Sequence, residues 1–190
     1  MVARPPLRLR IAAMRVEDIP DVHEIERASF PVPWPAYAFR QELETNRLAR
    51  YLVVRVGGEA VAYGGIWLMV DEAHITTFAV LPAWRRQGIG ARLLLALLDL
   101  AVELGATVAT LEVRLSNLEA RRLYERFGFM PVGVRPHYYS DNAEDALIMT
   151  SEEFRTPSMR ARLERLRAEV EPAGEPRGSS ASWAPDDDGH

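Results

Sequence analysis

The stretch "RRQGIG", from Arg85 to Gly90, places two arginines and two glycines between a β-type run, "HITTFAVLP", and a long apolar run, "ARLLLALLDLAVELGA". A glycine-containing turn that opens a helix gathers backbone N–H groups around one point, and such a point binds phosphate oxygens. Glycines let the backbone come close to a ligand because they carry no Cβ, and arginines add charge-assisted contacts to a diphosphate. The stretch therefore predicts a site for a phosphate-bearing ligand.

Two common phosphate-binding motifs do not fit this stretch. The Walker motif needs a lysine, and the chain contains no Lys. The dinucleotide fingerprint needs a third glycine, where this chain has Leu93 or its neighbours. For the stretch taken by itself, a helix start without any ligand remains the alternative.

Composition narrows the classes of function. With 190 residues, of which 48% are hydrophobic, the chain is long enough for one well-buried core. The net charge of −4 opposes broad binding to nucleic acid. The absence of Cys excludes disulfides, thiolate metal sites and a Cys nucleophile, and the absence of Lys excludes a Schiff base. We expect no bound metal.

Neither end of the chain predicts export or membrane insertion. The N-terminus, "MVARPPLRLRIAAM", lacks a sustained apolar core before a small-residue cleavage site. The longest apolar run is interrupted by Arg92, Asp99 and Glu103. We therefore expect a cytoplasmic protein that has no membrane contact.

Hydrophobic periodicity and turn residues predict the elements that must position the Arg85 to Gly90 stretch. Strands are expected over residues 7–14, 50–56, 59–70, 73–82, 107–115, 130–139 and 144–151, and helices over 16–30, 36–46, 91–104 and 116–129. The strands between residues 50 and 82 are joined by tight turns and predict an antiparallel meander. In the helix after residue 115, Ser116 and Glu119 fit a capping box.

The C-terminal part of the chain differs from the preceding domain in its residue pattern. We expect a domain over residues 1–155, an amphipathic helix over 156–171 and a disordered acidic tail over 172–190. The helix carries its apolar stripe on Met159, Leu163, Leu166 and Val170. It either docks on the domain or a partner, or is a solvated helix.

The pattern Arg-x-x-Gly-x-Gly resembles the acetyl-coenzyme A (acetyl-CoA) pyrophosphate loop of the GNAT superfamily of N-acetyltransferases, and the resemblance extends from about Leu9 to Thr150. It implies an α+β fold with a central, mostly antiparallel seven-stranded sheet flanked by about four helices. It also implies that the coenzyme is held by Arg85, Arg86, Gln87, Gly88, Ile89, Gly90 and Ala91. The strand should be splayed from its neighbour at Phe78, Ala79 and Val80, so that its backbone pairs with the pantetheine and an N–H near Val80 polarises the thioester.

The segments "LEVRLSNLEARRLYERFGF", "RPHYYSDNAEDALIM" and "SFPVPW" resemble one branch of this superfamily, the bacterial ribosomal-protein alanine N-acetyltransferases. The branch often has Asn where this chain has Thr77. The resemblance implies that the enzyme transfers the acetyl group of acetyl-CoA to the N-terminal α-amine of a protein. The acceptor it implies is an N-terminal alanine of a ribosomal protein. It implies no particular oligomeric state. Transfer is expected to be direct, in a ternary complex, because no Cys can carry the acyl group.

Three residues match catalytic or coenzyme-contacting positions of the branch. Glu112 matches the general base, acting directly or through a water; an ion pair with Arg114 or a neighbour is the alternative. Tyr124 matches the general acid that protonates the coenzyme sulfur, although a core tyrosine would have the same helical spacing. Asn117 matches a pantetheine contact and can also cap its helix.

The acceptor is expected between two walls, one formed by Pro33 and Trp34 and the other by Tyr138 and Tyr139. His137 is either an alternative base or a structural residue. Two other functions stay open at this point. One is acetyl transfer to a small amine or a Lys side chain. The other is a non-catalytic acetyl-CoA-binding module whose C-terminal helix docks to a partner.

Overall fold

The computed structural model describes residues 9–170, which form one seven-stranded sheet in the order β1-β2-β3-β4-β5-β7-β6. The strands are β1 (Leu9–Ala13), β2 (Ala49–Val56), β3 (Glu59–Met69), β4 (Glu72–Val80), β5 (Val108–Arg114), β6 (Phe129–Arg135) and β7 (Ala146–Ser151). All neighbours pair antiparallel except β4 and β5, which are parallel. The predicted meander and the mostly antiparallel seven-stranded sheet are both confirmed.

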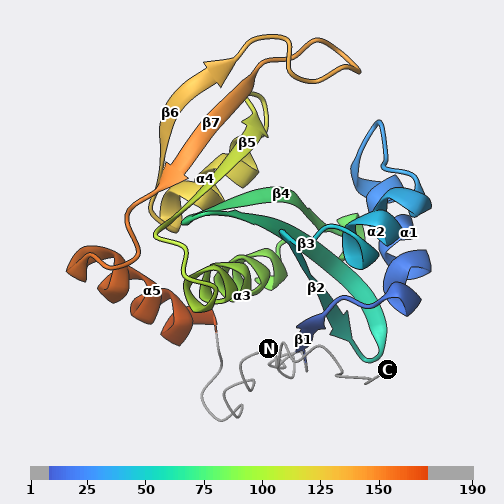
Figure 1. Ribbon diagram of the computed structural model, residues 1–190, viewed down its shortest axis with the longest axis horizontal. Helices are drawn as coiled ribbons and strands as arrows, with labels where there is room; N and C mark the ends of the chain where they lie inside the picture. Colours follow the sequence, from blue (N-terminus) through green and yellow to red (C-terminus); the bar gives the residue numbers. More distant parts are fainter. Residues whose placement is uncertain (1–8, 171–190) are drawn as a thin grey trace, which may run out of the picture.

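Helices cover both faces of the sheet (Figure 1). They are α1 (Ile19–Ser29), α2 (Ala36–Glu44), α3 (Ile89–Glu103), α4 (Leu118–Arg126) and α5 (Pro157–Val170), with short 3-10 turns at Val16–Asp18 and Pro82–Trp84. Apolar side chains of α1 and α2 pack in one cluster with Tyr63 and Ala79 of the sheet. Those of α3, α4 and α5 pack in another with Ile75 and Leu111. We call these sides of the sheet the α1–α2 face and the α3–α4 face.

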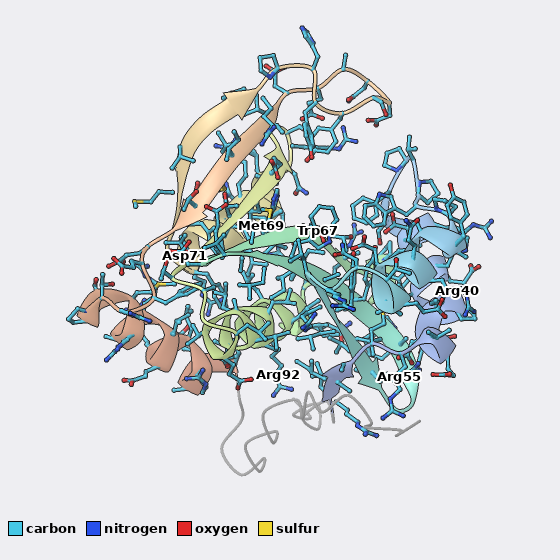
Figure 2. All side chains as sticks on the ribbon, in the orientation of Figure 1. Arg40, Arg55, Trp67, Met69, Asp71 and Arg92 are labelled. Carbon is cyan, nitrogen blue, oxygen red and sulfur yellow. The ribbon has the colours of Figure 1, made fainter. Side chains whose placement is uncertain are left out.

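Helix α5 docks on its own domain. Met159, Leu163 and Leu166 are buried, as the predicted apolar stripe requires. Two of the charged residues that interrupt the apolar run of α3 face α5: Arg167 pairs with Asp99 at 2.6 Å, and Arg92 donates to the Val170 carbonyl at 2.6 Å. Figure 2 shows Arg92 below α3, on the side of the sheet opposite Trp67. Helix α5 therefore packs against α3 on the α3–α4 face.

The start of α4 differs from the predicted capping box. The helix begins at Leu118, so Asn117 is the N-cap and its Oδ1 accepts from the Ala120 N–H at 3.1 Å. Ser116 lies one residue too early to cap, and its N–H donates instead to Glu144 at 2.8 Å. The capping role predicted as an alternative for Asn117 is confirmed.

Within residues 9–170, no helix has the length and apolarity needed to cross a membrane. In the same part of the chain, no cluster of three or more His, Asp and Glu side chains is arranged to hold a metal ion. The tail predicted over 172–190 lies outside the described residues.

Candidate functional site

The site is built around an opening between two parallel strands. The β4–β5 ladder runs from Glu72 opposite Val108 to Ile75 opposite Leu111 and then stops. Beyond it, β4 continues against β3 as far as Val80, whereas β5 continues against β7 as far as Arg114. The predicted splay is therefore confirmed, and residues 76–80 have no strand partner on the β5 side.

The register of β4 decides which backbone groups face this opening. Leu81 donates its N–H to the Val61 carbonyl at 2.9 Å, and hydrogen-bonded pairs alternate along an antiparallel ladder. Ala79 therefore points its backbone groups toward β3, while Phe78 and Val80 point theirs toward the opening. The Val80 carbonyl accepts from Arg85 Nε at 3.0 Å, so an extended amide chain is offered both backbone groups of Phe78 and the N–H of Val80.

The Gly-rich loop leaves a run of amides without protein acceptors. The first bond that reaches into α3 joins the Arg92 N–H to the Gly88 carbonyl at 3.1 Å. No described residue accepts from the N–H groups of residues 86–91. These groups, with the positive end of the helix dipole, form an anion site as the loop predicts.

The two glycines of this loop serve different purposes. Gly88 has φ +80, a left-handed conformation that favours glycine. Gly90 does not have a left-handed backbone conformation. A Cβ there would lie 3.6 Å from Leu123 and 3.7 Å from Val80, which are ordinary contacts. Because the protein alone would tolerate a side chain at Gly90, the missing Cβ matches the close approach of a ligand.

Tyr124 lines the same opening from the α3–α4 face. Its ring lies 6.2 Å from that of Phe78 and 5.7 Å from that of Phe129. Burial raises the pKa of Tyr124, so the phenol stays neutral, and its hydroxyl has no hydrogen-bond partner among the described residues. The ring of Tyr124 is thus part of the core, and its hydroxyl is available to donate a proton.

Glu112 lies on the opposite side of the sheet. Leu111 and Val113 of β5 join the core on the α3–α4 face, so Glu112 points to the α1–α2 face. Its side chain is 8% exposed and contacts His74 Nε2 at 2.6 Å and Arg135 Nε at 3.0 Å. The hydrogen bond to His74 is the largest cause that lowers the pKa of Glu112, against the opposing effect of burial.

His74 and Arg135 are partners of Glu112 that the sequence patterns did not reveal. His74 faces Thr110 across the parallel ladder, so Glu112 lies two residues further along the same face of β5. The alternation of β4 could have placed His74 on the polar face of its strand, but not beside Glu112. The predicted alternative partner, Arg114, is engaged elsewhere.

Arg114 organises the connection between β6 and β7. It pairs with Asp141 at 2.7 Å and with Glu144 at 3.1 Å, and its guanidinium lies 3.8 Å from the centre of the Tyr139 ring. The ring of Tyr138 meets that of Tyr139 edge-on at 5.2 Å. Burial raises the pKa of Tyr139 to about 12. The partly buried Arg114 therefore holds the ring of Tyr139 in place, and Tyr138 packs against that ring.

His137 holds the same connection. Its N–H donates to Asp145 at 2.8 Å, and its Nδ1 lies 3.1 Å from the Ala143 carbonyl. Both contacts are internal to the loop. The structure therefore favours the structural role that was the alternative for this residue.

Pro33 and Trp34 lie in the connection between α1 and α2. The Trp34 N–H donates to Glu26 Oε1 at 2.9 Å, and the Trp34 ring lies 5.9 Å from that of Phe39. Pro33 is exposed. Figure 1 shows this connection and that between β6 and β7 at the same upper right side of the molecule.

A splayed β4–β5 pair, an anion site at the start of α3 and ionisable groups on both sides of the opening define the acyl-CoA N-acyltransferase class. The chain belongs to the Acetyltransferase (GNAT) family, whose sequence model matches residues 19–129. It is an N-acetyltransferase, and the family uses acetyl-CoA.

Named relatives share most of this chain. A Bacillus subtilis protein, provisionally named a [ribosomal protein bS18]-alanine N-acetyltransferase, is 46% identical over 136 residues, covering 72% of this chain and 90% of the relative. The Escherichia coli [ribosomal protein bS18]-alanine N-acetyltransferase is 35% identical over 143 residues, covering 73% and 94%. A crystal structure of the Escherichia coli ribosomal-protein-S18-alanine N-acetyltransferase superposes with a TM-score of 0.70 at 32% identity, covering 75% and 92%.

Proposed function

We propose that this enzyme acetylates the N-terminal α-amine of a protein, and that its acceptor is a ribosomal protein that begins with alanine. The observation that carries the proposal is the 46% identity to the Bacillus subtilis relative over 90% of that protein. The two aromatic loop segments at one side of the molecule support it, because a peptide end needs walls and backbone contacts.

The coenzyme would be held on the α3–α4 face and in the opening. The amides of residues 86–91 and the side chains of Arg85 and Arg86 suit its pyrophosphate. The outward backbone groups of Phe78 and the outward N–H of Val80 suit its amide-bearing arm, and the side-chain NH₂ of Asn117 is a further donor. Acetyl-CoA supplies the acetyl thioester, whose carbonyl the Val80 N–H would polarise.

Proton transfer is assigned to groups on the two sides of the opening. Glu112 is ionised at neutral pH because its pKa is lowered, so its carboxylate attracts the acceptor ammonium and takes its proton directly or through a water. His74 contacts the same carboxylate and orients it. Tyr124 is neutral and gives its proton to the departing sulfur.

The acceptor would lie between Trp34 and the Tyr138–Tyr139 pair, on the face that carries Glu112. Direct transfer in a ternary complex follows from the absence of any Cys in the chain. The alternative of a non-catalytic module loses its basis, because the apolar stripe of α5 that would dock to a partner is buried against the domain.

Intact-mass detection of acetyl transfer tests the proposal. Purified protein and acetyl-CoA are incubated with matched peptides that begin with Ala, Met, Ser or Gly, each with a free and a blocked N-terminus. We expect acetylation of the Ala peptide that disappears on blocking. A clear preference for a free small amine or a Lys side chain over every peptide would replace the proposed acceptor.

A further inference from the structure

Glu26 of α1 is a buried carboxylate that the acetyl-transfer chemistry does not use. It is 3% exposed, and no Arg forms an ion pair with it among residues 9–170. Burial raises the pKa of Glu26. An unpaired buried carboxylate is costly, so its presence requires a compensating set of hydrogen bonds.

Those hydrogen bonds join the acceptor side of the site to the strand that borders the opening. Oε1 of Glu26 accepts from the Trp34 N–H at 2.9 Å, and Oε2 accepts from the Tyr63 hydroxyl in a short contact. The Tyr63 oxygen lies 3.0 Å from Thr77 Oγ1. Thr77 belongs to residues 76–80 of β4, which have no partner on the β5 side.

The Tyr63 hydroxyl sets the direction of this chain of bonds. It has one proton, which it donates to Glu26 Oε2, so its oxygen is left to accept from Thr77. The same carboxylate satisfies a backbone N–H in a loop that contains three prolines and has few amides to anchor it. One side chain thus ties α1, the α1–α2 connection, β3 and β4 together.

We propose that Glu26 is a positioning residue for the acceptor, which holds the connection over residues 30–35 at a set place relative to the open part of β4. The proposal rests on the proposed function only in placing the acceptor against Trp34. It does not involve the coenzyme, because the anion site at residues 86–91 lies at the start of α3, on the other face of the sheet.

Kinetics of Glu26→Gln provide the first test. The variant keeps the shape but turns an amide NH₂ toward Trp34 N–H or Tyr63. We expect the KM for the acceptor to rise roughly tenfold, which is the effect of losing one buried hydrogen bond. The kcat and the KM for acetyl-CoA should stay within about twofold, the pattern of lost uniform binding. Tyr63→Phe should move the acceptor KM in the same direction.

Glu24→Gln is the matched control, because Glu24 lies on the same helix, is exposed and pairs only with Arg27 at 3.3 Å. Its acceptor KM should equal that of the wild type. If Glu26→Gln lowered thermal stability but left the acceptor KM unchanged, the role would be structural alone and the proposal would be overturned.

Hydrogen exchange tests the positioning role of Glu26 independently of the proposed acceptor. Peptides covering residues 30–35 should exchange faster in Glu26→Gln than in the wild type or Glu24→Gln, without any acceptor present. If the wild type acetylates no peptide α-amine, the proposed acceptor fails, and the KM comparison is made with the amine that the wild type does acetylate. Unchanged exchange at residues 30–35 would overturn the positioning role in either case.

Discussion

At the scale of single residues, the two groups proposed to transfer protons differ in their surroundings. Glu112 has a lowered pKa because His74 and Arg135 contact its carboxylate, whereas Tyr124 has a raised pKa because apolar rings bury it. One group is therefore ionised and the other neutral at the same pH, as a proton acceptor and a proton donor in one reaction require.

Replacing either group should slow turnover and leave coenzyme binding intact. We expect Glu112→Gln and Tyr124→Phe to lower kcat by roughly 10² or more, since general acid–base groups contribute on this scale. The affinity for acetyl-CoA, measured by calorimetry, should change little. Glu125→Gln is the control, because Glu125 is exposed beside Tyr124 on α4. Unchanged turnover in both variants would contradict the assigned roles.

The pKa of Glu112 also predicts how stability depends on pH. Because its pKa is lower in the folded state than the ordinary value of 4.5, Glu112 stabilises the fold above that value, and this contribution is lost as the pH falls through the folded pKa. His74→Asn removes the largest cause of the shift. Urea unfolding between about pH 7 and pH 3 should therefore show a smaller acid-induced loss of stability in His74→Asn. Equal losses in the two proteins would refute the coupling.

At the scale of elements, the splay between β4 and β5 turns backbone groups into binding groups. The loop before α3 adds the amides of residues 86–91, which no described residue accepts from. Both features come from the ends of elements, where backbone donors have no intrinsic partner. The proposed coenzyme site is thus formed mainly by main chain.

The two loop glycines should respond differently to substitution. Gly88→Ala forces a residue with a Cβ to φ +80 and should destabilise the protein by about 1 kcal/mol. Gly90→Ala makes only ordinary contacts and should leave the stability unchanged or raise it by up to about 1 kcal/mol, while weakening acetyl-CoA binding. Thermal unfolding and calorimetry check both. Wild-type affinity in Gly90→Ala would show that no ligand approaches that position.

At the scale of the whole molecule, α5 is part of the domain core and not a loose appendage. Met159 is fully buried and Leu166 is 1% exposed, both in the cluster that contains α3. The helix packs behind α3, on the side away from the Glu112 carboxylate. It therefore supports the coenzyme-binding helix without contacting the proposed acceptor walls.

Truncating the α5 stripe should reduce stability without changing the chemistry. Leu166→Ala should lower the free energy of unfolding by about 2–5 kcal/mol, the usual cost of an apolar cavity. Asp99→Asn, which removes the partly exposed pair with Arg167, should cost about 1 kcal/mol or less. Denaturant unfolding measures both, and kcat below the transition should match the wild type. A cost for Leu166→Ala no larger than that for Asp99→Asn would mean that α5 is not part of the core.

The sequence by itself determined the features that arise from neighbours along the chain. Alternation and turn residues predicted the meander over β2, β3 and β4, and helical spacing predicted the apolar stripe of α5. The loop at Arg85 to Gly90 was predicted because glycine, arginine and a helix start act together within six positions. These properties need no knowledge of which strands are adjacent.

Only the tertiary structure decided the contacts between distant residues. Glu112 meets His74 because the parallel ladder brings β4 and β5 together, and it meets Arg135 from a strand that is not its neighbour in the sheet. Glu26 meets Trp34 and Tyr63, and is linked through Tyr63 to Thr77, only because α1 covers that face. Even the cap of α4 depended on where the turn after β5 ended, which shifted the role from Ser116 to Asn117. Register and packing set these pairs, and neither is encoded in a local pattern.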